Sequence, residues 1–342
     1  MGKNPTIKDV AQKANVSMAT VSRVINNHKT VNTELTERVW SAIRETNFNP
    51  NHAARSLVKQ KTNTIGIIVH NLHDPFFYDL IRGFEKGAEG TDYNIIFCSI
   101  TGYNAEQKLQ YLRYLRNGVV DAVVLYGSYH FDDGIIRFIN TSDPINIVMI
   151  ENEGIGLNCN KMLIDNYGGA QKAVQYLLQK GHRRIAHICG NPNKKVSVDR
   201  LNGYIFAMQQ AGVEILSDYV QHTSTDSHSG YDKMRTLLEL KNPPTAVFCS
   251  DDGIASYAVR AALDMGLRVP EDISVIGFDN RAFLPDGYKG PEITSVSQPL
   301  YDVGYDCIQL LCRQLNEGAS ECPFRKLYET TIVEKETVCH PK

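Results

Sequence analysis

The sequence predicts an α/β protein in which a small helical head precedes a larger body of two lobes built on parallel sheets. Residues 1–62 hold ten Lys and Arg against four Asp and Glu, whereas the remaining 280 residues hold twenty-six against thirty-four. From Thr64 onward, continuous apolar runs alternate with helical stretches, which is typical of βαβ units and parallel sheets. A basic head on an acidic body predicts that the head meets a polyanion.

The head begins with two short helices. Apolar residues recur at helical spacing from Ile7 to Ala14, and Asn15-Val16 alone separates this stretch from a second one over residues 17–26. Ser17 can cap the second helix, because its hydroxyl can accept from the free amides of the first turn. Helices joined this tightly pack at a steep angle, so we expect a helix-turn-helix, whose second helix enters the major groove of DNA.

A third helix is expected over residues 32–47, where Val39 and Ile43 belong to one apolar stripe and Trp40 lies beside it. It closes a three-helix core, and we place the DNA-binding domain at residues 1–48.

Residues 49–62 form a separate segment, a hinge helix with its linker. Pro50 ends the preceding structure and Asn51 can cap a new helix. The run that follows is shorter than the roughly 12–15 residues that an isolated helix needs in water. We therefore expect this helix to fold when a partner holds it, with an ordinary interdomain linker as the alternative.

Thr6 to Arg23, followed by Asn49-Pro50-Asn51-x-x-Ala54-x-x-Leu57, resembles the lactose-repressor/galactose-repressor family of bacterial transcription regulators. The resemblance implies a homodimer on double-stranded operator DNA, with the paired hinge helices in the minor groove and Leu57 wedged between two base pairs. Such a wedge costs a few kcal/mol per base step, so we expect an easily deformed pyrimidine–purine step at the operator centre. Repression released by an inducer is the implied mode, and a corepressor or an activator is the alternative.

The resemblance also places Met18 and Ala19 where this family reads sequence. Neither side chain can make a bidentate hydrogen bond to a purine, and both suit contact with a thymine methyl group. Arg23 is expected to touch DNA, with either a base or a phosphate as its partner. The expected DNA-contacting residues are Thr6, Ser17, Met18, Ala19, Thr20, Ser22, Arg23, Asn26, Asn51, Ala54 and Leu57.

The body, residues 63–342, exceeds a single domain of ordinary size, so two lobes are expected. Its apolar runs predict strands at residues 64–69, 93–99, 121–125, 145–150, 185–189, 246–250 and 274–278. The resemblance implies the fold of the periplasmic sugar-binding proteins, with three chain crossings between the lobes, near residues 163–165, 293–295 and 321–323. The first lobe then comprises about 63–163 and 294–322, and the second about 164–293 and 323–342.

Polar residues follow the predicted strands, and open parallel sheets bind ligands at the carboxyl ends of their strands. Carboxylates accept hydrogen bonds from sugar hydroxyls, a guanidinium donates in a fork, and an aromatic ring covers the apolar face of a sugar. Asp74 is equally well explained as a helix N-cap, and Asp165 and Asn166 resemble a cap and a turn. The expected effector-binding residues are Asp74, Phe76, Phe77, Tyr126, Glu151, Arg200, Asp251, Asp279 and Gln298.

The excess of carboxylates in this set favours a neutral sugar as the effector. Lys194 and Lys195 lie in a loop that can reach the cleft, so a sugar phosphate is an alternative. A purine or another non-sugar effector is a further alternative, because Phe76 or Phe77 can stack on a base.

Sequence motifs of catalysis are absent: the chain has no Gly-x-Ser-x-Gly, no Walker phosphate loop, no Gly-x-Gly-x-x-Gly and no His-Glu-x-x-His. Its eight cysteines form no Cys-x-x-Cys pair, and its ten histidines show no ligand spacing. We therefore expect no catalytic residue, metal or cofactor, which disfavours a sugar-modifying enzyme. The head disfavours an uptake module, and the lack of a signal peptide or of about 18 consecutive apolar residues predicts a cytoplasmic protein without a membrane partner.

Overall fold

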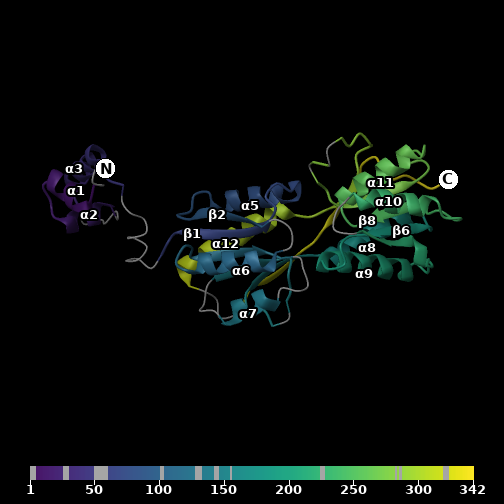
Figure 1. Ribbon diagram of the computed structural model, residues 1–342, viewed down its shortest axis with the longest axis horizontal. Coiled ribbons are helices and arrows are strands. Elements are labelled where there is room, and N and C mark those ends of the chain that lie inside the picture. The colour runs from purple at the N-terminus through teal and green to yellow at the C-terminus, as the bar shows by residue number, and fades with distance from the viewer. Residues whose placement is uncertain are drawn as a thin grey trace. The chain divides into compact units, whose positions relative to one another are not determined.

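The computed structural model describes residues 5–25, 31–49, 61–100, 104–127, 133–141, 146–154, 156–223, 228–281, 283–284, 287–318 and 323–342. The chain divides into two compact units, Met1–Thr62 and Asn63–Lys342. They are the head and the two-lobed body (Figure 1).

The head contains α1 (Ile7–Lys13), α2 (Met18–Ile25) and α3 (Thr33–Thr46). At the start of each helix, a polar side chain accepts from a backbone amide that has no partner within the helix. The Asp9 carboxylate accepts from the Thr6 backbone N–H at 2.7 Å, and Ser17 Oγ accepts from Thr20 N–H at 3.1 Å. Asn32 Oδ1 caps α3 by accepting from Leu35 N–H at 2.8 Å.

One residue from each helix is completely buried in the core of the head: Val10, Val21 and Val39. Trp40 remains 40 % exposed at the edge of this core. The three-helix arrangement follows from the apolar spacing of the sequence, and the cap residues set the helix boundaries.

The first lobe contains a six-stranded parallel sheet in the order β11-β5-β4-β3-β1-β2. Its strands are β1 (Thr64–His70), β2 (Asn94–Ile100), β3 (Ala122–Tyr126), β4 (Asn146–Ile150), β5 (Asn160–Ile164) and β11 (Arg325–Tyr328). Its helices are the 3-10 turn η1 (Pro75–Phe77), α5 (Tyr78–Ala88), α6 (Ala105–Arg116), α7 (Asp133–Thr141) and α12 (Leu300–Glu317).

Helices cover both faces of this sheet, which explains why β3 is buried along its whole length. α5 and α12 cover one face, and α6 and α7 the other. α12 packs directly on α5, although more than two hundred residues separate them (Figure 1). A Cβ atom on Gly83 of α5 would lie 2.1 Å from the Tyr301 carbonyl oxygen of α12, so only glycine permits this approach.

The second lobe contains another six-stranded sheet, in the order β12-β10-β9-β8-β6-β7, parallel except for the β10–β12 pair. Its strands are β6 (Ile185–Cys189), β7 (Val220–His222), β8 (Ala246–Cys249), β9 (Ser274–Asp279), β10 (Thr294–Ser297) and β12 (Thr331–Val333). Its helices are α8 (Asn166–Gln179), α9 (Lys195–Gln210), the 3-10 turn η2 (Ser217–Tyr219), α10 (Ser229–Leu238) and α11 (Asp252–Asp264). α8 and α9 pack on one face, and α10 and α11 on the other.

The predicted fold class is confirmed, and the crossings need correction. The first lies between β5 and α8, at the predicted place. The second follows β10, near Gln298-Pro299, because residues 294–297 belong to the second sheet. The third follows β11, near Glu329-Thr330, because residues 325–328 belong to the first sheet. The sequence misses β11 because it is exposed at three of its four positions and has no continuous apolar run.

Among the described helices, none combines the length and the apolar character that crossing a bilayer would require.

Candidate functional site

The start of α2 is the surface that the sequence assigns to DNA. Met18 is 53 % exposed, and the Ser17 hydroxyl lies 2.9 Å from that of Thr20 in addition to capping the helix. Ser17 therefore shapes the first turn as well as facing solvent. Of the eleven expected DNA-contacting residues, five are exposed and two are half-buried: Thr6, Ser17, Met18, Ala19 and Arg23, then Thr20 and Ser22. The other four lie outside the described residues: Asn26, Asn51, Ala54 and Leu57.

A cavity of about 340 Å³ lies between the two lobes, at the carboxyl ends of β1 and β3 on one side and of β6, β8 and β9 on the other. It contains seven of the nine expected effector-binding residues: Asp74, Phe76, Phe77, Tyr126, Arg200, Asp251 and Asp279. The other lining residues are His70, Asn71, Gly190, Asn191, Lys194, Val196, Ser197, Ser250 and Arg281.

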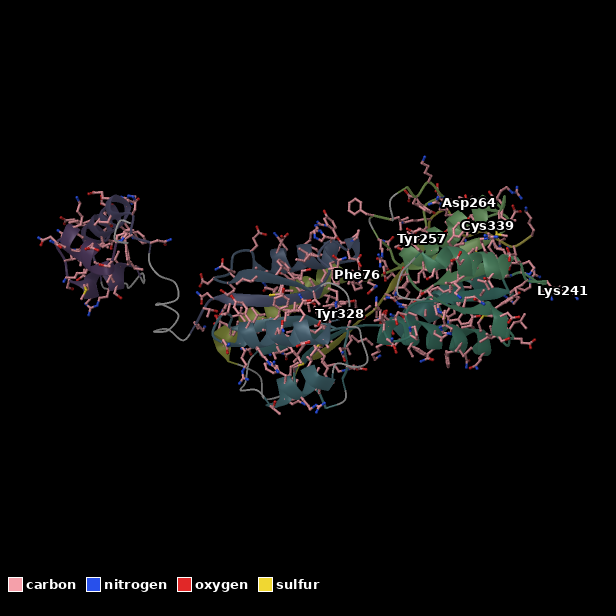
Figure 2. All side chains as sticks on the ribbon, viewed as in Figure 1. Phe76, Lys241, Tyr257, Asp264, Tyr328 and Cys339 are labelled. Atoms are coloured by element: carbon pink, nitrogen blue, oxygen red, sulfur yellow. The ribbon has the colours of Figure 1, made fainter. Side chains whose placement is uncertain are left out.

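Aromatic rings form the wall from the first lobe. Phe77 and Tyr126 pack edge to face at 5.0 Å, and Phe76 contacts Phe77 in the same manner at 5.1 Å. Phe77 is buried and Phe76 is half-buried, so Phe76 is the ring that an incoming ligand can cover. Figure 2 shows Phe76 at the side of the first lobe that faces the second.

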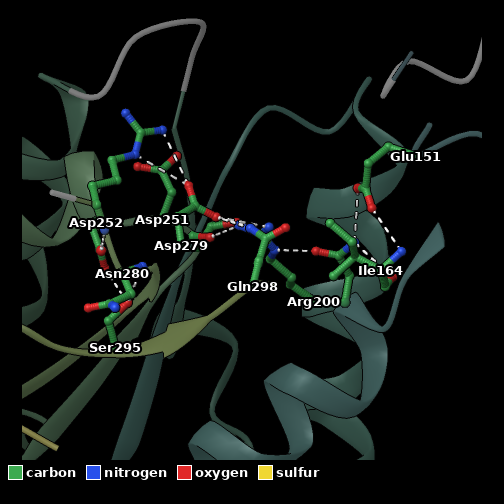
Figure 3. A network of polar contacts seen from close by, with 12 residues as sticks. Glu151, Ile164, Arg200, Asp251, Asp252, Asp279, Asn280, Ser295 and Gln298 are labelled. Carbon is green, nitrogen blue, oxygen red and sulfur yellow. Dashed lines mark hydrogen bonds and ion pairs between the residues drawn. The ribbon is translucent and has the colours of Figure 1, made fainter. Parts of the chain in front are cut away.

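Asp279, at the end of β9, is the centre of the polar wall from the second lobe (Figure 3). Its Oδ1 accepts from Gln298 Nε2 at 2.6 Å and pairs with Arg200 Nη2 at 3.1 Å. Arg281 reaches Oδ2 through Nε and Nη2, each at 3.3 Å. Burial raises the pKa of Asp279, and the two guanidinium groups act in the opposite direction. Gln298 holds this carboxylate from behind, and its own buried Oε1 has no hydrogen-bond partner among the described residues.

Glu151 also lies behind the cavity. Its carboxylate accepts from the backbone N–H of Ile164 and from Nδ2 of Asn166, both at 3.1 Å. Asn166 Oδ1 in turn accepts from Arg200 Nε at 2.9 Å, so Glu151 orients Arg200 through Asn166. Burial raises the pKa of Glu151 to about 7, against the opposing effect of Arg200. Glu151 and Asn166 both line a neighbouring cavity of about 250 Å³.

Two carboxylates of the cavity also cap helices. Asp74 Oδ1 accepts from Phe76 N–H at 3.0 Å, and Asp251 Oδ1 accepts from Ile254 N–H at 2.9 Å. Asp74 therefore has the capping role that the sequence left open and lines the cavity as well. Asp165 caps α8, as expected, but Asn166 is a buried member of the polar network and not a simple turn residue.

Sequence reasoning missed Arg281 and Asp252. Arg281 lies two residues beyond β9, where the polar sequence Asp279-Asn280 had already marked the strand end. Asp252 follows Asp251 and is buried, with its Oδ1 accepting from Ser295 Oγ at 2.7 Å. Burial raises the pKa of Asp252 to about 7, and nearby Asp279 acts in the same direction.

Arg281 changes the charge of the cavity. Three carboxylates line it and are matched by three cations: Asp74, Asp251 and Asp279, then Lys194, Arg200 and Arg281. Lys195 instead pairs with Asp199 and lines the neighbouring cavity. The expected excess of carboxylates is therefore not found. Within the described part of the chain, no three His, Cys, Asp or Glu side chains are grouped as a metal site.

Comparison with known proteins relates both units to one family. Residues 6–51 match the model of bacterial regulatory proteins of the lacI family, and residues 174–338 match a periplasmic binding protein-like domain. The chain is 36 % identical to the HTH-type transcriptional regulator RegA of Clostridium saccharobutylicum, over 97 % of this chain and 98 % of that protein.

Two solved structures are similar along nearly the whole chain. The transcriptional regulator CelR in complex with cellobiose is 29 % identical, with a TM-score of 0.71 over 97 % of this chain and 99 % of that one. The lac repressor dimer bound to operator and the anti-inducer ONPF has a TM-score of 0.86 at 22 % identity, over 98 % of this chain and 100 % of that one. The second likeness shows a shared fold.

Proposed function

Because the chain belongs to the lacI family of bacterial regulatory proteins, we propose that it is a cytoplasmic repressor of carbohydrate-use genes whose operator affinity is set by a small sugar. Proteins of this family are DNA-binding transcription regulators and not enzymes. The proposal adds the class of the effector, its site between the lobes and a homodimeric state. Repression relieved by the sugar is the proposed sign, and activation is the alternative.

The cavity between the lobes is the observation that carries the proposal. Its charged groups balance, three against three, so a neutral ligand can enter without an uncompensated charge. Carboxylates and guanidinium groups together offer both acceptors and donors, which a hydroxyl requires because it donates one hydrogen bond and accepts others. Phe76 supplies the apolar surface for one face of a ring. CelR, whose complex contains cellobiose, has the same two-lobed architecture.

A purine or a sugar phosphate is the second candidate ligand. Phe76 can stack on a base as well as on a sugar, and Lys194 adds a cation at the cavity wall.

On the DNA, we propose that two heads read a two-fold-symmetric operator, because one helix-turn-helix contacts too few base pairs for useful specificity. The effector then acts through a difference in its affinity for the DNA-competent and incompetent states, and the coupling is reciprocal.

The proposal is tested with the full-length protein and an operator selected from random duplexes. Fluorescence anisotropy of that operator is followed while D-glucose, D-galactose, D-ribose, cellobiose, glucose 6-phosphate or guanine is added. A shift with one of the four unphosphorylated sugars supports the proposal. A shift in anisotropy with glucose 6-phosphate or guanine alone would show that the effector is a sugar phosphate or a purine and not a neutral sugar. No shift with any of the six compounds would contradict the sensor role.

Leu57 is the proposed wedge of the hinge helix, although it lies outside the described residues. Leu57→Ala should weaken specific operator binding far more than non-specific binding, because the phosphate contacts remain. Anisotropy with operator and scrambled duplexes at one salt concentration measures both, and equal losses would contradict the wedge.

A further inference from the structure

Arg281 enters the cleft from a turn that the fold holds in an unusual conformation. Asp279 and Asn280 have φ values of 101° and 48°, in the left-handed region that side chains rarely adopt. Asn280 N–H donates to Ser295 Oγ at 3.0 Å, and Arg281 N–H donates to Asp252 Oδ2 at 2.8 Å, which fixes the turn on both sides. Such strain persists where the surroundings over-determine it, and it clusters at functional sites.

The guanidinium of Arg281 has ion-pair partners in both lobes. Its Nη1 lies 3.3 Å from Asp74 Oδ1 of the first lobe, and its Nη2 lies 3.3 Å from Asp279 Oδ2 of the second. Burial acts to lower the pKa of Arg281, but the carboxylates of Asp251, Asp279 and Asp74 raise it above its usual value. Arg281 is therefore a permanent cation at the junction of the lobes.

The two arginines of the cavity are held differently. Arg200 is 6 % exposed, and its contacts at 2.9 Å to Asn166 and 3.1 Å to Asp279 lie within the second lobe. Arg281 is 18 % exposed, and its three side-chain contacts, each of 3.3 Å, are longer than those of Arg200. Arg200 is thus fixed in place, whereas Arg281 can exchange its partners at little cost.

We propose that Arg281 is a ligand-binding residue and that its ion pair with Asp74 joins the two lobes until a ligand enters between them. The pairing of the lobes does not depend on the proposed function, whereas the ligand part rests on it. The ligand class is a ring with two adjacent hydroxyl groups, whose oxygens accept from the guanidinium fork while one hydroxyl donates to Asp74. The ligand then replaces a direct contact between the lobes by a longer, bridged one, which changes their spacing.

The pairing of the lobes is tested first without ligand, by hydrogen exchange and mass spectrometry on the full-length chain. Arg281→Gln should speed exchange across residues 71–77 of the opposite lobe by about two- to fivefold, the effect of a partly exposed ion pair. Asp74→Asn should produce the same change across residues 276–281, and it keeps a good N-cap for η1. In the double variant, exchange should be no faster than in either single variant, because both substitutions remove the same ion pair. Unchanged exchange across the cleft, or additive effects, would overturn the pairing.

Arg268→Gln is the matched control. Arg268 pairs with Asp272 at 2.7 Å within the second lobe, so its loss should leave exchange across residues 71–77 unchanged. A change equal to that of Arg281→Gln would show that any lost ion pair loosens the body, and it would overturn the assignment to Arg281.

The ligand role is tested by calorimetry with D-glucose, D-galactose, D-ribose and cellobiose. A sugar that binds the wild type should bind Arg281→Gln about tenfold or more weakly, the effect of losing a charge-assisted hydrogen bond. Equal affinities would overturn the ligand role of Arg281. If none of the four binds the wild type, the ligand role fails together with the sugar proposal, and the exchange experiment still decides the pairing of the lobes.

Discussion

The two walls of the cleft stand at the same kind of sheet edge and are built differently. The first lobe contributes the rings of Phe76, Phe77 and Tyr126, packed edge to face. The second contributes a hydrogen-bonded network centred on Asp279, in which Arg200 is almost completely buried. The apolar contact between a ligand and an aromatic ring varies little with the orientation of the ligand, whereas hydrogen bonds fix that orientation. The difference indicates that the hydrogen-bonding groups, most of them in the second lobe, decide which ligand is accepted, while the aromatic rings of the first lobe cover it.

The largest expected effect comes from removing Arg200, the most deeply buried arginine of the second wall. Arg200→Ala removes the buried ion pair with Asp279 and the hydrogen bond to Asn166, and breaking a buried ion pair of this kind costs about 3–5 kcal/mol. We expect the effector response to be lost and the free energy of unfolding to fall by that amount, as measured by urea denaturation and operator anisotropy. An intact sugar response would remove Arg200 from the site and would contradict the division between the walls.

The next prediction concerns the pH dependence of the same network. Burial raises the pKa of Glu151 from its ordinary value of 4.5 to about 7. The carboxyl group of Glu151 therefore binds its proton more tightly in the folded protein than in the unfolded chain. Its contribution to stability is largest below pH 4.5 and is lost as the pH rises through 7. This contribution to the free energy of unfolding amounts to about 3 kcal/mol.

Glu151→Gln removes this titration while keeping a side chain of similar shape. The free energy of unfolding of the variant minus that of the wild type should therefore be larger at pH 8 than at pH 5.5. Urea denaturation of both proteins at the two pH values measures the difference. Parallel pH profiles would show that Glu151 does not titrate in this range.

A substitution that overfills the contact between α5 and α12 in the first lobe should lower the free energy of unfolding by about 1–3 kcal/mol, the usual cost of overpacking. Gly83→Ala would place a Cβ atom 2.1 Å from the Tyr301 carbonyl oxygen and force α5 away from α12. Gly134→Ala is the control, because its Cβ atom would meet Leu109 at an ordinary 3.5 Å. Thermal unfolding should show a loss for Gly83→Ala alone, and similar melting temperatures for both would contradict the close approach of the helices.

The smallest effect is expected at the aromatic wall. Phe76→Ala removes the half-buried ring and should weaken sugar binding about tenfold, equivalent to 1.4 kcal/mol, with the order of preference among sugars unchanged. Calorimetry with two sugars that bind the wild type measures both quantities. A change in preference between them would show that the aromatic rings also select the ligand.

Local patterns predicted most of the head and part of the cleft. Helical spacing around Val10, Val21 and Val39 was sufficient for a three-helix core, because each apolar stripe can be buried only against the other two. The strand ends indicated most of the cavity, because parallel strands point their carboxyl ends in one direction. Glu151 was included by the same rule, although it lies behind the cavity and acts through Asn166.

The sequence by itself determined the fold class, the family, the helix-turn-helix and seven of the residues that line the cavity, because these depend on periodicity and on short segments. The tertiary structure decided which sheet receives β10 and β11 and showed that Arg281 meets Asp74, more than two hundred residues away. Neither β10 nor β11 has a continuous apolar run, and an ion pair between distant segments leaves no local pattern. Such features follow from the way the two lobes meet in space and not from the order of residues along either one.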